Sequence, residues 1–336
     1  MLARKLSSVF ALVMAIGALA GCENPSAAGE AIVIKIAHVS QQGVPVDRWA
    51  RKFGETIAER SGGAIAVEVF PNSSLGGNRE LLEQLQLGGL EAAISSVAFL
   101  GGFTNTTKLL DLPYLFKHNA GAEAVLDGEV GQAMFASLKE SGFIGLAWLS
   151  TGWRHLTANK EIRSPDGMKG LKIRVMDNPL HIAHFNALGA SAIPMAFSEV
   201  FTALQQGTID CQENPYANIQ GNRLNEVQKY IIKTGHIYDT SPLLYSQALW
   251  DNFSGDQQNL IVKAVADTLA WQRAISAEDE LVVENAFKNN GKNVIVELTA
   301  DERAEFRRIA QKVYDQFQDE IGPELIKKVD AIQAGL

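Results

Sequence analysis

Apolar and polar positions along the first hundred residues alternate in the order strand, helix, strand, helix, strand. Short apolar, β-branched runs predict buried strands at 31–39, 64–70 and 90–96. Two helices are expected between them, at 46–61 and 78–87; in the first, Trp49, Phe53 and Ile57 recur four residues apart on one face. This alternation predicts a largely parallel sheet that helices cover on both faces.

The rest of the chain predicts further strands and a mostly helical end. Apolar runs predict strands or extended segments at 144–149, 171–175, 209–212 and 294–298. Ser198 is expected to cap a helix that Gly207 ends. Ser254 and Thr299 each precede a glutamine or glutamate by three residues, which is the spacing of a capping box. The first of these boxes predicts one long helix that ends near Asn289.

The N-terminal segment carries the features of a bacterial lipoprotein signal. Arg4 and Lys5 precede an apolar run too short to span a bilayer, and Leu-Ala-Gly stands directly before Cys22. We expect a signal peptide over 1–21, lipidation of Cys22, and a polar tether over 22–31 that holds the protein to a membrane in the periplasm. An ordinary signal peptide with a chance cysteine is the alternative.

Composition and charge narrow the classes of function. The 336 residues are 46% hydrophobic and 20% charged, which is typical of a soluble globular chain long enough for two lobes. Without Arg4 and Lys5, 28 basic residues stand against 38 acidic ones, and this net charge of −10 argues against nucleic acid as a partner. Individual arginines would have to hold an anionic ligand against that charge. With Cys22 lipidated or removed, Cys211 is the one cysteine left, so no intramolecular disulfide is expected.

Catalytic and metal-binding motifs are absent from the sequence. It contains no nucleophile elbow, no His-Glu-x-x-His, no phosphate loop and no Gly-x-Gly-x-x-Gly. His181 and His184 are three residues apart, but no cysteine or carboxylate nearby completes a metal site. We therefore expect a binding protein without cofactor or metal. A periplasmic enzyme acting on a carboxylated sugar is the alternative from another class, and it has Glu213 as its one obvious cleft acid.

Two arginines and an asparagine suit the capture of a carboxylate. Arg174 lies inside the apolar strand Leu-Lys-Ile-Arg-Val-Met, where a guanidinium needs an acidic partner from the protein or from a ligand. Arg154 follows Gly-Trp and can offer a second planar fork. Asn214 is held extended by the proline after it, and its amide can both donate and accept hydrogen bonds. An internal salt bridge explains Arg174 alone equally well, whereas the three residues together favour a ligand.

Six segments together resemble the solute-binding proteins of bacterial TRAP transporters, the DctP-type family. They are FPNSSLGGNRELLEQLQLGGLEAAISS, DLPYLF, GWRHLTANK, KGLKIRV, PMAFSEVFTALQQGTIDCQENP and NEVQKYIIKTGH. The resemblance runs from about Ile32 to the C-terminal helices, and the order and spacing of the segments make it specific. Within the family, GWRHLTANK and the Asn178-Pro179 region resemble the binders of sugar acids such as uronates or diketogulonate.

The resemblance implies an α/β, two-lobed fold like that of periplasmic binding proteins, with a ligand cleft between the lobes and a long helix connecting both. Lobe I would comprise 32–151 and 240–280, and lobe II 152–239 and 281–336. The protein is expected to be a monomer that closes on an organic acid, a uronate or related sugar acid, and delivers it to the membrane subunits of an ion-driven permease. A C4-dicarboxylate or another monocarboxylate as ligand, and a sensory role, stay open as alternatives.

The resemblance also implies the residues of a ligand site. Arg174 would bond the ligand carboxylate, with Arg154 assisting, Asn214 contacting the ligand and Phe197 packing on it. Further positions expected to line the pocket are His38, Asn78, Ser96, Asp177, Asn178 and His236. The chain departs from the family at Cys211, where glycine is common, and at Ser96, where sialic-acid binders carry glutamate; the second departure disfavours sialic acid.

Overall fold

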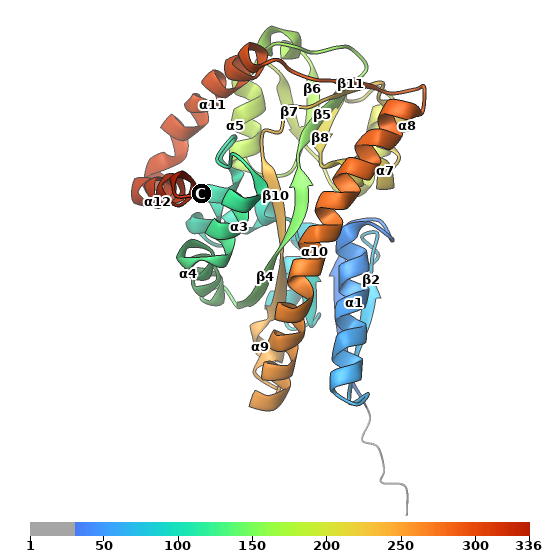
Figure 1. Cartoon of the computed structure of the whole chain (residues 1–336), viewed down its shortest axis with the longest axis vertical. Coiled ribbons are helices and arrows are strands. Elements are labelled where there is room, and N and C mark those ends of the chain that lie inside the picture. The colour runs from blue at the N-terminus through green and yellow to red at the C-terminus, as the bar shows by residue number, and fades with distance from the viewer. Residues whose placement is uncertain (1–30) are drawn as a thin grey trace, which may run out of the picture.

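The computed structural model describes residues 31–336 and consists of two mixed β-sheets with helices packed around them (Figure 1). This α/β architecture agrees with the fold predicted from the sequence. The expected signal peptide, Cys22 and all but the last residue of the expected tether lie outside the described residues.

The first sheet has five strands and combines parallel with antiparallel pairing. Their order across the sheet is β2 (Ile65–Phe70), β1 (Ile32–His38), β3 (Ala92–Ile94), β10 (Tyr238–Ser246) and β4 (Phe143–Trp153). Strands β1, β2 and β3 are parallel, as the alternating pattern predicts. The expectation of a largely parallel sheet is wrong for the other half, because β10 returns from the second sheet and runs antiparallel to both β3 and β4.

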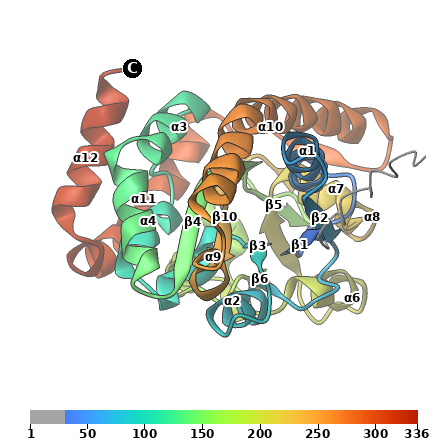
Figure 2. The same ribbon diagram turned by 90° about the horizontal axis from the view of Figure 1, so that it is seen from below.

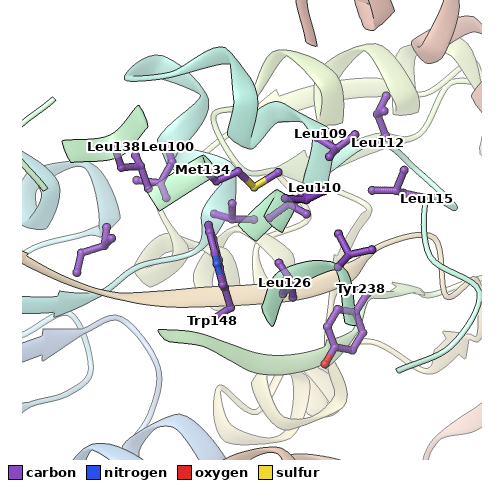
Figure 3. Packing of buried hydrophobic residues seen from close by; sticks show 14 of the residues in the cluster. Leu100, Leu109, Leu110, Leu112, Leu115, Leu126, Met134, Leu138, Trp148 and Tyr238 are labelled. Carbon is purple, nitrogen blue, oxygen red and sulfur yellow. The ribbon is translucent and has the colours of Figure 1, made fainter. Parts of the chain in front are cut away.

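Helices bury both faces of the first sheet. One face is covered by α1 (Pro45–Arg60) and α10 (Gly255–Asn289), which lie side by side in Figure 2. The other face carries α3 (Asn119–Asp127), α4 (Glu129–Lys139) and two 3₁₀ segments, Val97–Gly102 and Asn105–Asp111. Figure 3 shows the apolar cluster beneath these elements, in which leucines of the 3₁₀ segments pack with Met134 and Trp148. Short helices α2 (Asn78–Gln86) and α9 (Gln247–Trp250) contact each other at one end of the sheet.

The second sheet has six strands. Their order is β11 (Val294–Val296), β9 (Tyr230–Ile232), β5 (His155–Ala158), β8 (Cys211–Asn214), β6 (Lys172–Val175) and β7 (Ser191–Pro194). The helices that follow its strands are α5 (Pro179–Ala187), α6 (Val200–Gln205), α7 (Tyr216–Gly221), α8 (Leu224–Val227), α11 (Ala300–Ile321) and α12 (Pro323–Ala334). Helix α11 packs on α5, and α12 reaches α3 beside the first sheet.

The predicted helix boundaries hold in two places and fail in one. Both capping boxes, at Ser254 and Thr299, form as expected and open α10 and α11. The prediction that Ser198 caps a helix is wrong, because Ser198 lies inside the 3₁₀ turn Phe197–Glu199 and α6 begins at Val200 without a side-chain cap. Gly207 does follow the helix, with a φ of 68°.

The chain crosses between the sheets at two places, and one helix contacts both sheets. The chain passes from β4 into β5 through Arg154, and it returns from β9 into β10 through Ile237; the Arg154 amide donates to the Ile237 carbonyl at 2.9 Å. Helix α10 runs past both sheets, contacting α1 and β4 at one end and α7 and β11 at the other (Figure 1). The two crossing strands are therefore fixed to each other where they leave the first sheet.

A β-bulge interrupts the pairing of β4 with β10 near this crossing. Asp239 pairs with Gly152 and Thr240 pairs with Ser150, so Thr151 is the extra residue on β4. Gln272 of α10, which is fully buried, replaces the missing ladder bonds: its amide accepts from the Ser150 N–H at 2.9 Å and donates to the Ser150 carbonyl at 2.7 Å. The bulge turns Thr151 away from regular pairing and toward the space between the sheets.

Candidate functional site

A cavity lies between the two sheets, at the C-terminal ends of strands β1, β3, β6 and β8. Its empty volume is about 440 Å³. Residues from both sheets line it: Val39, Ser40, Val46, Asn78, Ile94, Ser96, Thr151, Arg154, Arg174, Met176, Phe197, Asn214, Asn218, Asp239 and Ser241. In open α/β sheets, ligands bind in the crevice outside the carboxyl ends of the strands, so this cavity is the candidate site.

A second hollow, of about 790 Å³ empty volume, shares Val39, Asn78 and Phe197 with the first. Its other lining residues include Arg79 of α2 and Asp177, which follows β6. Because the two spaces have walls in common, they adjoin, and we call the second one the mouth.

Arg174 is a buried cation without a carboxylate partner among the described residues. Its side chain is 1% exposed, and its Nε and Nη2 both donate to the Met195 carbonyl, at 3.0 and 2.8 Å. Its Nη1 is buried with no hydrogen-bond partner in the described part of the chain. The guanidinium carbon lies 5.6 Å from the centroid of the Phe197 ring. One side of this guanidinium is therefore held by the backbone, and the other has no acceptor among the described residues.

Burial changes the pKa of the Arg174 side chain. Desolvation lowers the pKa of Arg174 from its ordinary 12.5 to about 10; the charge of Glu213 opposes this shift, and the charge of Arg154 adds to it. The side chain is still protonated at neutral pH. An uncompensated buried charge is costly, so a bound anion would stabilise this site.

Arg154, by contrast, is fully engaged with protein carboxylates. Its Nε and Nη2 bond Glu213 Oε2 and Oε1 at 2.5 and 2.8 Å, and its Nη1 bonds Asp239 Oδ2 at 2.6 Å. Burial alone would lower the pKa of Arg154, but the two acids raise it above its ordinary value. The guanidinium forms part of the cavity wall, yet its planar fork faces Glu213 and not the cavity.

The acids of this triad differ in their surroundings. Burial would raise the pKa of Glu213, but Arg154 and a hydrogen bond from His236 Nε2 at 3.0 Å hold it well below its ordinary value. Burial raises the pKa of Asp239, which shares Arg154 with Glu213 and receives less compensation. Glu213 lies behind the wall, whereas Asp239 lines the cavity.

Six of the ten ligand-site residues expected from the sequence meet in the cavity wall. They are Asn78, Ser96, Arg154, Arg174, Phe197 and Asn214. Asn214 donates from Nδ2 to Gln212 Oε1 at 2.6 Å, and the Asn78 Oδ1 accepts from Ser95 Oγ and from the Ser96 N–H. These bonds fix the orientation of the amides before any ligand is present.

The other four expected residues lie outside the wall of the cavity. Asn178 caps α5 and donates to Asp111 Oδ2 at 2.9 Å, and His236 bonds Glu213. His38 is buried 3.4 Å from Asp47. Asp177 lies at the mouth, where it forms a 2.8 Å ion pair with Arg79 that joins a loop of the second sheet to α2 beside the first.

Sequence reasoning missed the side of the cavity that β4 and β10 supply. Thr151 faces the cavity through the bulge, and Asp239 and Ser241 share one face of β10 by their spacing of two residues. Strand β10 is hard to predict from the sequence because it contains Pro242, and a proline argues against a central strand. The alternation of Asp239 with Ser241 is the signal that could have found it.

Two further properties of residues 31–336 bear on function. No group of three or more histidine, cysteine, aspartate or glutamate side chains in this part of the chain is arranged to hold a metal ion. None of the helices in it is both long and apolar enough to cross a membrane.

Comparison with known proteins gives consistent matches along most of the chain. The family model "Bacterial extracellular solute-binding protein, family 7" (DctP) matches residues 36–320. The C4-dicarboxylate-binding periplasmic protein DctP of Rhodobacter capsulatus is 36% identical over 326 residues, covering 95% of this chain and 98% of the relative.

Two solved structures superpose closely on this chain, both at 31% identity and a TM-score of 0.88. One is a TRAP periplasmic solute-binding protein of Shewanella oneidensis with bound succinate, matched over 90% of this chain and 100% of that one. The other is the sugar acid binding protein DctPAm of Advenella mimigardefordensis in complex with galactonate, matched over 91% of this chain and 99% of that one.

The buried triad generates a prediction about stability. Replacing Glu213 with glutamine leaves the buried Arg154 with one carboxylate partner. Removing one partner of a buried ion pair costs about 3–5 kcal/mol, so we expect Glu213→Gln to lower the free energy of unfolding by about that amount in urea denaturation. Glu226→Gln is the matched control, because Glu226 pairs with Arg223 at the surface, and it should leave the free energy of unfolding almost unchanged. Equal losses for the two variants would contradict the structural role of the triad.

Proposed function

The chain belongs to family 7 of the bacterial extracellular solute-binding proteins, and we propose that it captures a sugar acid, a uronate or related hexonate, for a TRAP-type transporter. Membership in a family of solute-binding proteins agrees with the prediction of a transport component that is not an enzyme. As in the periplasmic relatives, capture would take place outside the cytoplasmic membrane. Delivery would be to the membrane subunits of a permease.

The observation that carries this proposal is the buried, unpartnered Nη1 of Arg174, a residue of the cavity wall. A carboxylate placed against Nη1 would give that donor its missing partner and would compensate the buried charge. Since Arg174 is already held by the Met195 carbonyl and the Phe197 ring, little side-chain entropy would be lost on binding. The bound succinate and galactonate of the two similar structures both carry carboxylates, which supports the same use of this residue.

The rest of the cavity supports a ligand with hydroxyl groups. Ser40, Ser96, Thr151 and Ser241 contribute hydroxyls to the wall, and Asn78 and Asn218 contribute amides. Each of these groups can both donate and accept hydrogen bonds, as a polyhydroxylated acid requires. A C4-dicarboxylate is the second candidate, and the similarity to the Rhodobacter protein and to the succinate complex favours it.

We further propose that the protein closes on its ligand as two lobes, 32–151 with 240–280 and 152–239 with 281–336. The two sheets, joined by β4, β10 and α10, support such a division, and the Arg79–Asp177 pair already bridges the mouth. The ligand would shift an equilibrium between open and closed forms by binding the closed form more tightly. The same closure would serve a sensor, and two permease genes next to this one would favour transport.

Calorimetry with galacturonate, galactonate, succinate and malate tests the ligand class and the role of Arg174 together. We expect the sugar acids to bind more tightly than the dicarboxylates, and Arg174→Ala to weaken their binding by roughly a hundredfold or more because a shielded, charge-assisted pair is lost. Arg174→Lys keeps the charge without the fork and should lose part of the affinity. Arg308→Ala removes an exposed arginine and serves as the control.

Two results would overturn this assignment. Heat of binding with succinate and malate alone would replace the sugar acid by a C4-dicarboxylate as the ligand. A loss of less than about tenfold in Arg174→Ala would exclude Arg174 as the main carboxylate contact.

The lowered pKa of Arg174 predicts how binding depends on pH. The ligand carboxylate pairs with the protonated guanidinium, whose pKa in the free protein is about 10. Affinity should therefore be constant between about pH 7 and 9 and should fall about tenfold for each pH unit above 10. Titrations at several pH values, with circular dichroism to verify folding, measure this. An affinity unchanged up to pH 11 would show that Arg174 does not bind as a cation of lowered pKa.

Anchoring through Cys22 is a separate proposal that rests on the sequence alone. The motif Leu-Ala-Gly-Cys supports cleavage before Cys22 and lipidation of its thiol. In Cys22→Ala expressed with the native leader, the uncleaved precursor should accumulate. Identical processing of both proteins to an unlipidated product, seen by mass spectrometry, would favour the ordinary signal peptide.

A further inference from the structure

Asp239 places a carboxylate in the cavity wall at the side formed by β4 and β10. Its side chain is buried, and its Oδ2 accepts the 2.6 Å bond from Arg154 Nη1. Its Oδ1 has one contact among the described residues, with Ser96 Oγ at 3.4 Å, which is long for a bond between two oxygens. One oxygen of this carboxylate is therefore fixed by the protein, and the other retains capacity to accept a hydrogen bond.

The charges at this side of the cavity leave a negative surplus. Within residues 31–336, Arg154 is the one cation in direct contact with Asp239, and Arg154 is shared between Asp239 and Glu213. His236, which bonds Glu213, does not restore the balance, because burial lowers the pKa of His236 and keeps it neutral at pH 7. Glu213 also acts on Arg174 from a distance, but the buried Nη1 of Arg174 has no hydrogen-bond partner in the described part of the chain. The cavity thus has one region suited to an anion and another that repels one.

Hydroxyl groups line the cavity together with Asp239. Ser96 lies at 3.4 Å, and Ser241 shares the same face of β10. Thr151, turned inward by the bulge, places its Oγ1 3.4 Å from Ser241 Oγ. Neutral hydroxyls beside a carboxylate form a good environment for ligand hydroxyls, which can donate to Asp239 and accept from the serines. They provide no positive charge for a second ligand carboxylate.

We propose that Asp239 is a specificity-determining residue: it accepts a hydrogen bond from a hydroxyl of the ligand and excludes a second carboxylate from this side of the cavity. This inference rests on the proposed function, in which Arg174 holds the first carboxylate. It assigns the ligand to monocarboxylic polyhydroxy acids and disfavours aldarates and C4-dicarboxylates. Like charges brought together in a shielded site oppose binding strongly, whereas a hydroxyl in the same position adds a charge-assisted bond.

A matched pair of ligands tests this directly. Galactonate and galactarate have the same carbon chain. They differ at one end, where galactonate has a hydroxymethyl group and galactarate has a second carboxylate. For the wild-type protein we expect galactonate to bind at least about a hundredfold more tightly than galactarate. Gluconate and glucarate provide a second pair with the same difference.

The variant Asp239→Asn then isolates the charge. Asparagine has nearly the same shape and can keep its oxygen on Arg154 Nη1 while its Nδ2 offers a donor to the cavity. The preference for galactonate should narrow to about tenfold or less, chiefly because galactarate binds better. Asp315→Asn, at an exposed position on α11, removes one negative charge elsewhere and should leave the preference unchanged.

The outcomes separate this inference from the function on which it rests. If the wild-type protein binds galactarate as tightly as galactonate, the inference is wrong even if Asp239→Asn does not fold. If Asp239→Asn folds and keeps the full preference, the inference is also wrong, although loss of binding in Arg174→Ala would still support the proposed function. If the wild-type protein binds neither the acids of these pairs nor galacturonate, the proposed function fails and the inference fails with it.

Discussion

The bonds of Arg154 hold the structure together where the chain passes between its two sheets. Arg154 lies at the junction of β4 and β5, Asp239 belongs to the first sheet and Glu213 to the second. All three side chains are buried, so separating them would leave charges without compensation inside the protein. This one guanidinium therefore ties β8 of the second sheet to β10 of the first beside the cavity.

A structural role for Arg154 leaves Arg174 available for a ligand. Both arginines are 1% exposed, but two carboxylates hold the first and one backbone carbonyl holds the second. The pKa of each follows from this difference, since the acids raise that of Arg154 and burial lowers that of Arg174. A cavity that holds one compensated and one uncompensated arginine can accept one carboxylate without losing its own internal pairs.

The sequence predicts those parts of the fold that depend on local pattern. The strands and helices up to residue 96, the two capping boxes and the long helix α10 follow from hydrophobic periodicity and from local hydrogen bonding. Strand β10 was missed because Pro242 lies inside it, and the mixed first sheet was missed with it. The bulge at Thr151 could not be predicted from the sequence either, because it depends on the register between two strands almost ninety residues apart. The partners of Arg154 depend on the same long-range pairing, so the sequence could indicate the residue but not its role.

A crystal structure of the protein with bound galactonate would test the division of roles between the two arginines most directly. We expect a ligand carboxylate within hydrogen-bond distance of Arg174 Nη1, while Arg154 keeps its bonds to Glu213 and Asp239. A ligand carboxylate bonded to Arg154, with the bonds of Arg154 to the two acids broken and Arg174 without contact to the ligand, would contradict this division of roles.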